Sequence, residues 1–121
     1  MEKDPRTHEI IGAAIEVHNI IGPGKLEAVY QECLGIEFKR RNITFVAQPQ
    51  LKIYYKEIEL EKYYIPDFIV FGEVVLEIKA AKTLTKEDEA QIINSLKISG
   101  HKICLLINFG EVSLRFKRFI N

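Results

Sequence analysis

The N-terminal third of the chain carries apolar side chains at the three- and four-residue spacing of amphipathic helices. One helix is predicted from Asp4-Pro5, a favourable N-cap and first helical residue, to the stop signal Gly22-Pro23-Gly24. A second is predicted over about residues 25–41, where the apolar positions are Leu26, Val29, Tyr30, Cys33, Leu34 and Phe38. The basic last turn of this segment suits a helix C-terminus, so we expect two consecutive helices.

Between residues 43 and 80 the pattern changes to β-branched and aromatic residues interrupted by turn signals. Strands are predicted near residues 50–56, 61–71 and 74–80, with turns at the charged stretch 56–62 and at Gly72-Glu73.

Helical spacing returns over residues 86–98, with Thr85 and Asp88 placed to form a capping box and Gly100 as the stop. Residues 101–109 contain a run that is apolar on both faces, Ile-Cys-Leu-Leu-Ile, which predicts a strand in the middle of a covered sheet. An alternating segment, residues 112–119, predicts a last strand.

This order of elements, α-α-β-β-β-α-β-β, describes an α/β fold with one mixed central sheet flanked by helices. The 121 residues include 47% hydrophobic and 28% charged residues, which is close to the globular average and enough for one core. We therefore expect a single domain over residues 1–121, with a helix over residues 1–22 and a core over residues 23–121.

Composition also limits the classes of function. Seventeen Lys and Arg balance seventeen Asp and Glu, so a nucleic acid would have to bind a local patch rather than a generally basic protein. The sequence shows no signal peptide and no apolar run near the roughly 20 residues of a membrane span, so we expect a cytoplasmic protein that does not enter membranes. Cys33 and Cys104 stand apart in apolar stretches, which predicts buried free thiols.

Charged residues interrupt the apolar segment 65–79. Asp67, Glu77 and Lys79 lie inside predicted strands, where a charge is costly unless it has a partner. If the strands form a hairpin centred on Gly72, Asp67 and Glu77 face each other and Lys79 shares their face. A two-residue loop at this turn would instead direct Glu77 away from Asp67.

These converging charges allow two interpretations. Two carboxylates about 4 Å apart repel by about 4 kcal/mol at an effective dielectric constant near 20, and a divalent cation reverses that interaction. Oxygen ligands suit Mg²⁺ or Mn²⁺, which activate water beside a phosphate, while Lys79 orients the water or stabilises the transition state. The alternative is a structural salt bridge from Lys79 to Glu77 or Asp67 on a solvated sheet face.

Two motifs resemble a known family. The PD pair at residues 66–67 followed by EIK at residues 77–79 resembles the PD-(D/E)xK nuclease superfamily, and GKLEAVY at residues 24–30 resembles the motif of its GxxExxY branch. The resemblance covers nearly the whole chain. It implies a restriction-endonuclease-like fold with an α-β-β-β-α-β core, to which the first predicted helix is an N-terminal addition.

The resemblance also implies roles for particular residues. Asp67 and Glu77 would be metal ligands, joined by Glu27 from the second helix, and Lys79 would be the catalytic lysine. Gln91 matches a glutamine that related nucleases carry on the helix after the lysine strand.

Several neighbouring residues also have structural interpretations. Glu27 shares a helical stripe with the apolar Tyr30 and Leu34, where a carboxylate needs a partner, but a Glu in a first helical turn is also favourable by itself. Tyr30 is expected to pack in the core with its hydroxyl near the site. His18 is expected to be a satisfied core or interface histidine.

The function implied is a Mg²⁺- or Mn²⁺-dependent nuclease, with DNA favoured over RNA. Lys82 and Lys86 would lie near the rim of the site, and residues 97–121 carry five basic residues against one acidic residue, so both groups could contact phosphates. The alternative for these cations is ordinary solubilising charge at a sheet edge. Two other functions stay open: a non-catalytic module that binds nucleic acid or protein, and a hydrolase of a smaller phosphate substrate. A homodimer is left open as well.

Overall fold

The computed structural model describes residues 4–121 and contains the three predicted helices with two more strands than expected. The helices are α1 (Pro5–Ile21), α2 (Glu27–Arg40) and α3 (Lys86–Ser99). The strands are β1 (Phe45–Ala47), β2 (Leu51–Tyr55), β3 (Ile58–Tyr64), β4 (Phe68–Val70), β5 (Val74–Lys79), β6 (Ile103–Asn108) and β7 (Arg115–Ile120). Within the described residues, no helix combines the length and apolarity needed to cross a bilayer.

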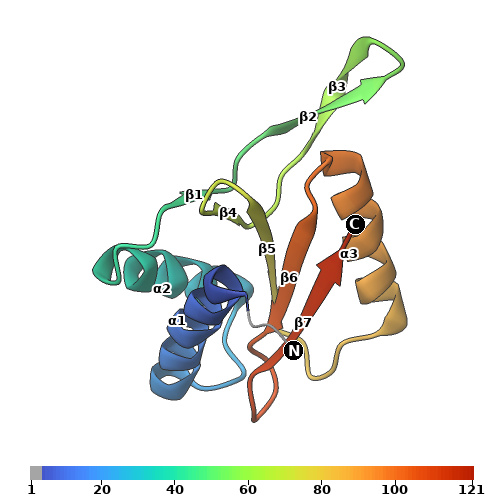
Figure 1. Ribbon diagram of the computed structural model, residues 1–121. Coiled ribbons are helices and arrows are strands. Elements are labelled where there is room, and N and C mark those ends of the chain that lie inside the picture. Colours follow the sequence, from blue (N-terminus) through green and yellow to red (C-terminus); the bar gives the residue numbers. More distant parts are fainter. Residues whose placement is uncertain (1–3) are drawn as a thin grey trace.

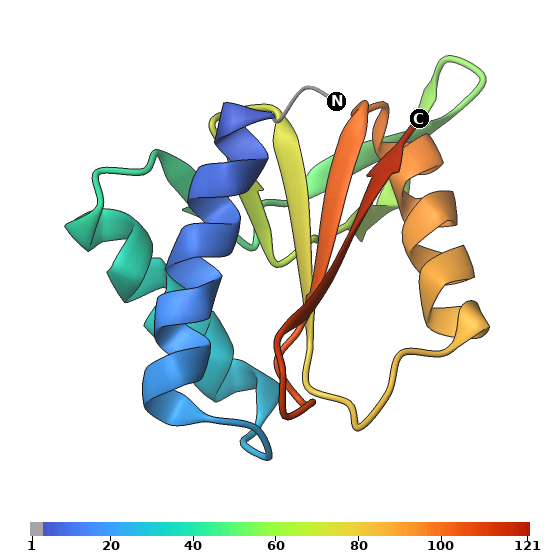
Figure 2. The ribbon, with the colours of Figure 1, turned by 60° about the horizontal axis from the view of Figure 1, so that its bottom comes forward.

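The main sheet is mixed and has five strands in the order β1-β4-β5-β6-β7. Strands β5 and β6 are parallel, and the other neighbours are antiparallel. Helix α3 connects the parallel pair and covers one face, while α1 and α2 cover the other (Figures 1 and 2). Strand β6 is buried between β5 and β7, as predicted for a central strand, and the predicted α/β fold is confirmed.

Each face of the sheet has its own apolar core. The larger core lies under α1 and α2, and the smaller one, under α3, includes Val75, Ile92 and Leu96. Successive strand residues point to opposite faces, so Val75 shares the α3 face with Glu77 and Lys79. The charged residues of β5 therefore lie on the face with the smaller core.

The predicted strand over residues 61–71 is wrong, because the chain is divided at Pro66 into the end of β3 and the separate strand β4. Proline lacks the amide hydrogen that a ladder needs and restricts the residue before it, so one strand ends here. Strands β2 and β3 form a separate two-stranded hairpin (Figure 1), and the predicted strand 50–56 is therefore not in the main sheet. The unpredicted β1 occupies the edge instead. The α-β-β-β-α-β core is α2, β1, β4, β5, α3 and β6, with this hairpin inserted after β1.

Two predicted boundaries also differ. The charged stretch 56–62 belongs mostly to β3, because both faces of the hairpin are largely exposed and charges there remain hydrated. Strand β7 begins at Arg115 rather than at residue 112, after a loop that follows β6. The capping box of Thr85 and Asp88 at the start of α3 is confirmed.

Buried polar and sulfur-containing side chains mostly follow the predictions. His18 is buried, and its Nε2 lies 2.9 Å from the carbonyl oxygen of Glu111, as expected for a satisfied core histidine. Both cysteines are free thiols, and Cys104 is buried. The predicted burial of Cys33 is wrong, since it lies on the part of α2 at the margin of the core and is only partly covered.

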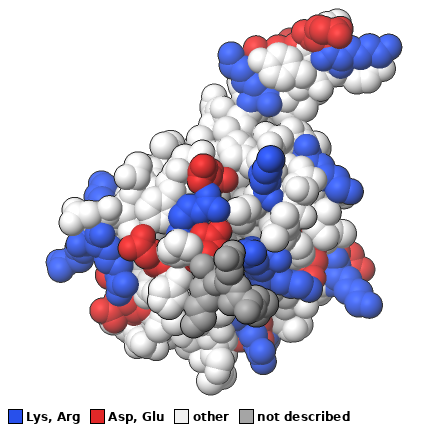
Figure 3. All heavy atoms as spheres, viewed as in Figure 1, with Lys and Arg blue, Asp and Glu red and all other residues white. Residues whose placement is uncertain are grey.

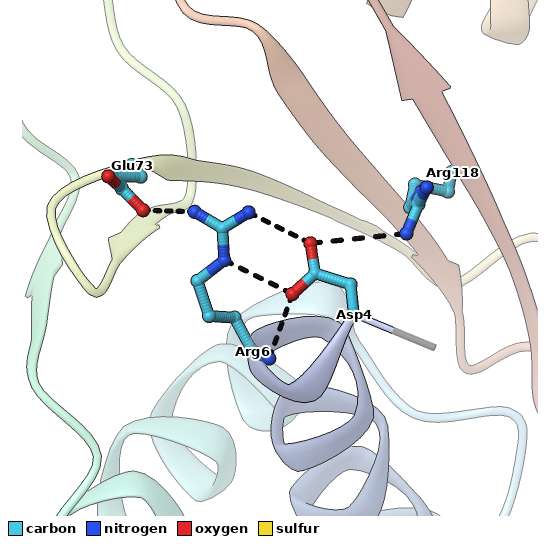
Figure 4. Close-up of polar contacts among 4 residues, drawn as sticks. All are labelled: Asp4, Arg6, Glu73 and Arg118. Carbon is cyan, nitrogen blue, oxygen red and sulfur yellow. Dashed lines mark hydrogen bonds and ion pairs between the residues drawn. The ribbon is translucent and has the colours of Figure 1, made fainter. Parts of the chain in front are cut away.

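An ion-pair network fixes the start of α1 (Figure 4). The Asp4 side chain accepts hydrogen bonds from the amide of Arg6 at 2.9 Å and from its guanidinium, which confirms the N-cap and holds the pKa of Asp4 below its usual value. Arg6 also pairs with Glu73 in the β4–β5 turn, and Arg118 of β7 lies 3.9 Å from Asp4. The network joins α1 to the sheet at the start of β5, whereas Lys79 lies at the other end of that strand.

The backbone after Lys79 is held by the last residue of β6 and by the loop that follows it. The buried Asn108 side chain accepts from the amide of Ala81 at 3.0 Å and donates to its carbonyl at 2.9 Å, and the amide of Phe109 donates to the carbonyl of Lys79 at 2.8 Å. Gly110 packs directly on this segment, since a Cβ added there would lie 2.3 Å from the carbonyl oxygen of Ala81. The loop therefore fixes the exit of β5.

Gly110→Ala is expected to lower the free energy of unfolding by about 1 to 3 kcal/mol, because its methyl group would overlap backbone that cannot rotate away. Gly35→Ala is the matched control: its Cβ would lie 3.9 Å from the Phe45 ring, and alanine favours a helix interior. Chemical denaturation of the three proteins measures both effects. Wild-type stability in Gly110→Ala would contradict the close packing of this loop.

Candidate active site

The turn between β4 and β5 determines whether Asp67 and Glu77 meet. The register places positions equally distant from Gly72 opposite each other, in the pairs Phe68–Leu76, Ile69–Val75 and Val70–Val74. The predicted hairpin centre is confirmed, and a two-residue loop is excluded. One step beyond these pairs, the amide of Asp67 donates to Glu77 Oε1 at 3.1 Å, and Asp67 Oδ2 accepts from the amide of Ile78 at 2.7 Å.

A pocket of about 480 Å³ lies beside these carboxylates. Its lining combines residues of α2, of the segment before β4, of β5 and of α3: Glu27, Asp67, Glu77, Ile78, Lys79, Gln91, Ile92, Asn94, Ser95 and Ile98. The five residues predicted as catalytic thus line one pocket. Glu27 and Gln91 are exposed, while Asp67, Glu77 and Lys79 are partly buried.

The carboxyl groups of the pocket bind protons more readily than they would in water. Burial raises the pKa of Glu77 to about 7, with a further increase from the charge of Asp67, against a hydrogen bond from Tyr64 that lowers it. Burial also raises the pKa of Asp67 above its usual value, and burial with the charge of Asp67 raises that of Glu27. Burial therefore favours the protonated form of these carboxyl groups, and a nearby positive charge would favour the ionised form.

Lys79 takes no part in the ion pairs formed within residues 4–121. Its charge is still close enough to lower the pKa of Asp67 and of Glu27. The alternative of a structural salt bridge to Glu77 or Asp67 is therefore wrong for the described structure, and Lys79 lines the pocket without an ion-pair partner among the described residues.

The sequence profile of the PD-(D/E)XK nuclease superfamily matches residues 4–119, almost the whole chain. The chain belongs to the PD-(D/E)XK nuclease superfamily. No curated protein and no solved structure matches it. The PD pair at residues 66–67 and EIK at residues 77–79 supply the two partly buried carboxylates and the lysine of the pocket. Nucleases of this superfamily generally use divalent metal ions.

The donor atoms of this superfamily site fit a divalent cation that keeps several waters. Asp67 and Glu77 converge, and the Oδ1 atom of Asp67 accepts no hydrogen bond from the described residues. Within residues 4–121, no three His, Cys, Asp or Glu side chains lie close enough together to hold one ion. Two carboxylates with water in the other positions are a common environment for Mg²⁺.

Two residues that form hydrogen bonds with Asp67 or Glu77 were not predicted. The Tyr64 hydroxyl donates to Glu77 Oε2 at 2.6 Å, and burial raises the pKa of Tyr64 far above its usual range, which keeps it a donor. The Gln31 side chain donates to the main-chain carbonyl of Asp67 at 2.9 Å. Gln31 lies one turn after Glu27, so helical spacing could have indicated it. No local pattern indicates Tyr64, which reaches the site from the inserted hairpin.

Tyr30 closes the loop that precedes Glu27. Its ring stacks on Phe109 with centroids 4.7 Å apart, which confirms the predicted packing role. Its hydroxyl donates to the carbonyl of Gly22 at 2.6 Å and accepts from the amide of Lys25 at 3.1 Å, and Tyr30 is not among the residues that line the pocket. Tyr30 thereby fixes the entry into α2.

The predicted phosphate contacts lie outside this pocket. Lys82 lines a separate pocket near the β6–β7 loop, and Lys86 is the first residue of α3. The basic residues of β7 pair with acids from other segments: Lys117–Glu89 at 2.6 Å, Arg115–Glu111 at 3.4 Å and Arg118–Asp4 at 3.9 Å. Acidic and basic side chains are interspersed on the face shown in Figure 3. The cations of β7 thus have structural partners at the sheet edge.

Proposed function

We propose that the protein is a Mg²⁺- or Mn²⁺-dependent nuclease that hydrolyses phosphodiester bonds, with DNA favoured over RNA. One observation carries this proposal: Asp67 and Glu77 converge, with raised carboxyl pKa values, in a pocket whose Lys79 pairs with none of the described acids. A purely structural cluster would match each buried carboxylate with a cation. This cluster instead fits a cation and a substrate phosphate.

Each residue of the pocket has a role in this proposal. Asp67 and Glu77 would hold the cation, and Glu27 would reach it through water from the rim. When bound, the ion would acidify the attacking water and offset negative charge on the phosphate. Lys79 would donate a hydrogen bond to the attacking water or to a phosphate oxygen, and Gln91 would orient one of these groups.

The proposal extends to the substrate and to the closer family. Residues 4–121 offer one five-stranded sheet with its helices and one hairpin as contact surface, which fits cleavage directed by ends or by structure better than recognition of one base sequence. Lys82 and Lys86 would contact phosphates beyond the pocket. The GKLEAVY segment places Glu27 at the pocket, which supports membership of the GxxExxY branch.

A cleavage panel tests this proposal. Labelled single-stranded, duplex and branched DNA and RNA are incubated with Mg²⁺, Mn²⁺ or EDTA. We expect products from the wild type with a metal ion, and none with EDTA or from Lys79→Ala. Lys39→Ala, which changes an exposed lysine of α2 outside the pocket, is the matched control and should cleave normally.

Two outcomes would replace the proposal. A folded protein that binds Mn²⁺ and nucleic acid but releases no product would be a non-catalytic binding module. Cleavage of nucleotide esters without cleavage of polymers would indicate a hydrolase of smaller phosphate substrates.

A further inference from the structure

The inserted hairpin, called the arm below, comprises β2 and β3 and projects from the rest of the molecule (Figure 1). Its side chains are mostly exposed, including the large apolar residues Tyr55 and Ile58 near its tip. An isolated two-stranded hairpin is marginally stable in water, so the arm depends on its attachment to the body. That attachment is at its base, where it contacts α3 and where Tyr64 packs against the smaller core.

A hydrogen bond at this base ends on a carboxylate of the candidate site. Tyr64, the last residue of β3, donates its hydroxyl to Glu77 Oε2 at 2.6 Å, and the other Glu77 oxygen accepts from the amide of Asp67 at 3.1 Å. The carboxylate of Glu77 is therefore held at both oxygens. The segment just before β4 supplies one of the two donors, and the arm supplies the other.

The hydrogen-bond partners of a metal ligand set its orientation and its basicity. Loss of such a partner typically lowers metal affinity about 10- to 100-fold. A carboxylate held at only one oxygen would rotate about that contact. Part of the free energy of cation binding would then be used to fix the orientation of the carboxylate. The hydroxyl of Tyr64 is the contact that prevents this rotation of Glu77.

We propose that Tyr64 is a positioning residue that orients Glu77 for cation binding. Through the same hydrogen bond, a cation bound at the site makes the arm more ordered. The inference rests on the proposed function only in that Asp67 and Glu77 bind a divalent cation. Because linkage is reciprocal, a cation that favours the held position of Glu77 also favours the attached arm. The site and the arm then respond to each other through one hydrogen bond.

The test compares Tyr64→Phe with Tyr63→Phe. The first variant keeps the packed ring and loses only the hydroxyl, while Tyr63 is half-exposed and its hydroxyl forms no hydrogen bond with the described residues. Calorimetric titration with MnCl₂ alone should show Tyr64→Phe binding about 10- to 100-fold more weakly than the wild type. Tyr63→Phe should bind as the wild type does.

Hydrogen exchange of residues 51–64 supplies a second readout, which a packing role alone would not change. Mn²⁺ should slow exchange in the arm of the wild type and of Tyr63→Phe, and should leave it unchanged in Tyr64→Phe. Equal Mn²⁺ affinity in the wild type and Tyr64→Phe would overturn the inference while leaving the cation site intact. If Mn²⁺ does not alter hydrogen exchange of the arm in the wild type, that result alone would overturn the inference. A wild type that binds no Mn²⁺ would overturn the proposed site itself.

Discussion

Lys79→Met is expected to lower turnover about 10²- to 10³-fold while leaving Mn²⁺ affinity unchanged or higher. The ammonium group pairs with none of the acids in residues 4–121, and its charge is felt by Asp67 and Glu27. Its removal takes a donor away from the substrate and also takes a positive charge away from the carboxylates. A divalent cation is then repelled less.

Asp67→Asn is the comparison variant for this experiment, because it keeps the shape of the side chain and removes its charge. We expect Mn²⁺ affinity to fall at least about 10²-fold and turnover to fall with it. Calorimetry with MnCl₂ and turnover on the preferred substrate of the cleavage panel measure the two effects separately. If Lys79→Met lost Mn²⁺ binding as severely as Asp67→Asn, the lysine would be holding the carboxylates and would not be acting on the substrate.

Glu77→Gln is expected to make the metal-free protein more stable above about pH 7, by about 3 kcal/mol. Burial raises the pKa of Glu77 from 4.5 to about 7 in the folded protein. The folded state therefore keeps a proton that the unfolded state releases. The stability linked to that proton is present below about pH 4.5 and is lost as the pH rises through about 7, where Glu77 becomes charged in the fold. Glutamine has no such proton to lose.

Urea denaturation between about pH 4 and pH 9 in EDTA measures this difference. Glu61→Gln, which changes an exposed glutamate of the arm, should show no comparable gain with pH. Saturating Mn²⁺ should stabilise the wild type and have a much smaller effect on Glu77→Gln. A Glu77→Gln variant that is less stable than the wild type throughout this range would make Glu77 a structural partner instead of a ligand.

Features that depend on neighbouring residues could be predicted from the sequence. The N-cap of Asp4 and the capping box of Thr85 each depend on contacts within one helical turn. The opposition of Asp67 and Glu77 depends on a single turn at Gly72, so counting from its centre was sufficient. For these features, the local pattern and the final structure agree.

Features that depend on the choice of a distant partner could not be predicted. Strands β2 and β4 are both rich in β-branched or aromatic residues, and neither local sequence indicates which sheet the strand joins. That choice follows from the break at Pro66 and from packing of the arm on α3. The contact between Tyr64 and Glu77 arises only after this choice, as do the ion pairs that offset the basic residues of β7.

The two ends of the inserted hairpin meet. Ala47 of β1 pairs with Phe68 of β4, and the amide of Gln48 donates to the carbonyl of Asp67 at 2.9 Å, so the chain leaves and re-enters the main sheet at one place. Segments with adjoining ends tolerate changes in length, because the entropic cost of a longer loop grows slowly. Lengthening or shortening the outer part of the hairpin would therefore change how far the molecule reaches beyond the pocket. The base at Tyr64 and the carboxylates of the pocket would keep their positions. A change in the length of this hairpin would therefore alter which substrates the molecule contacts and leave the pocket residues unchanged.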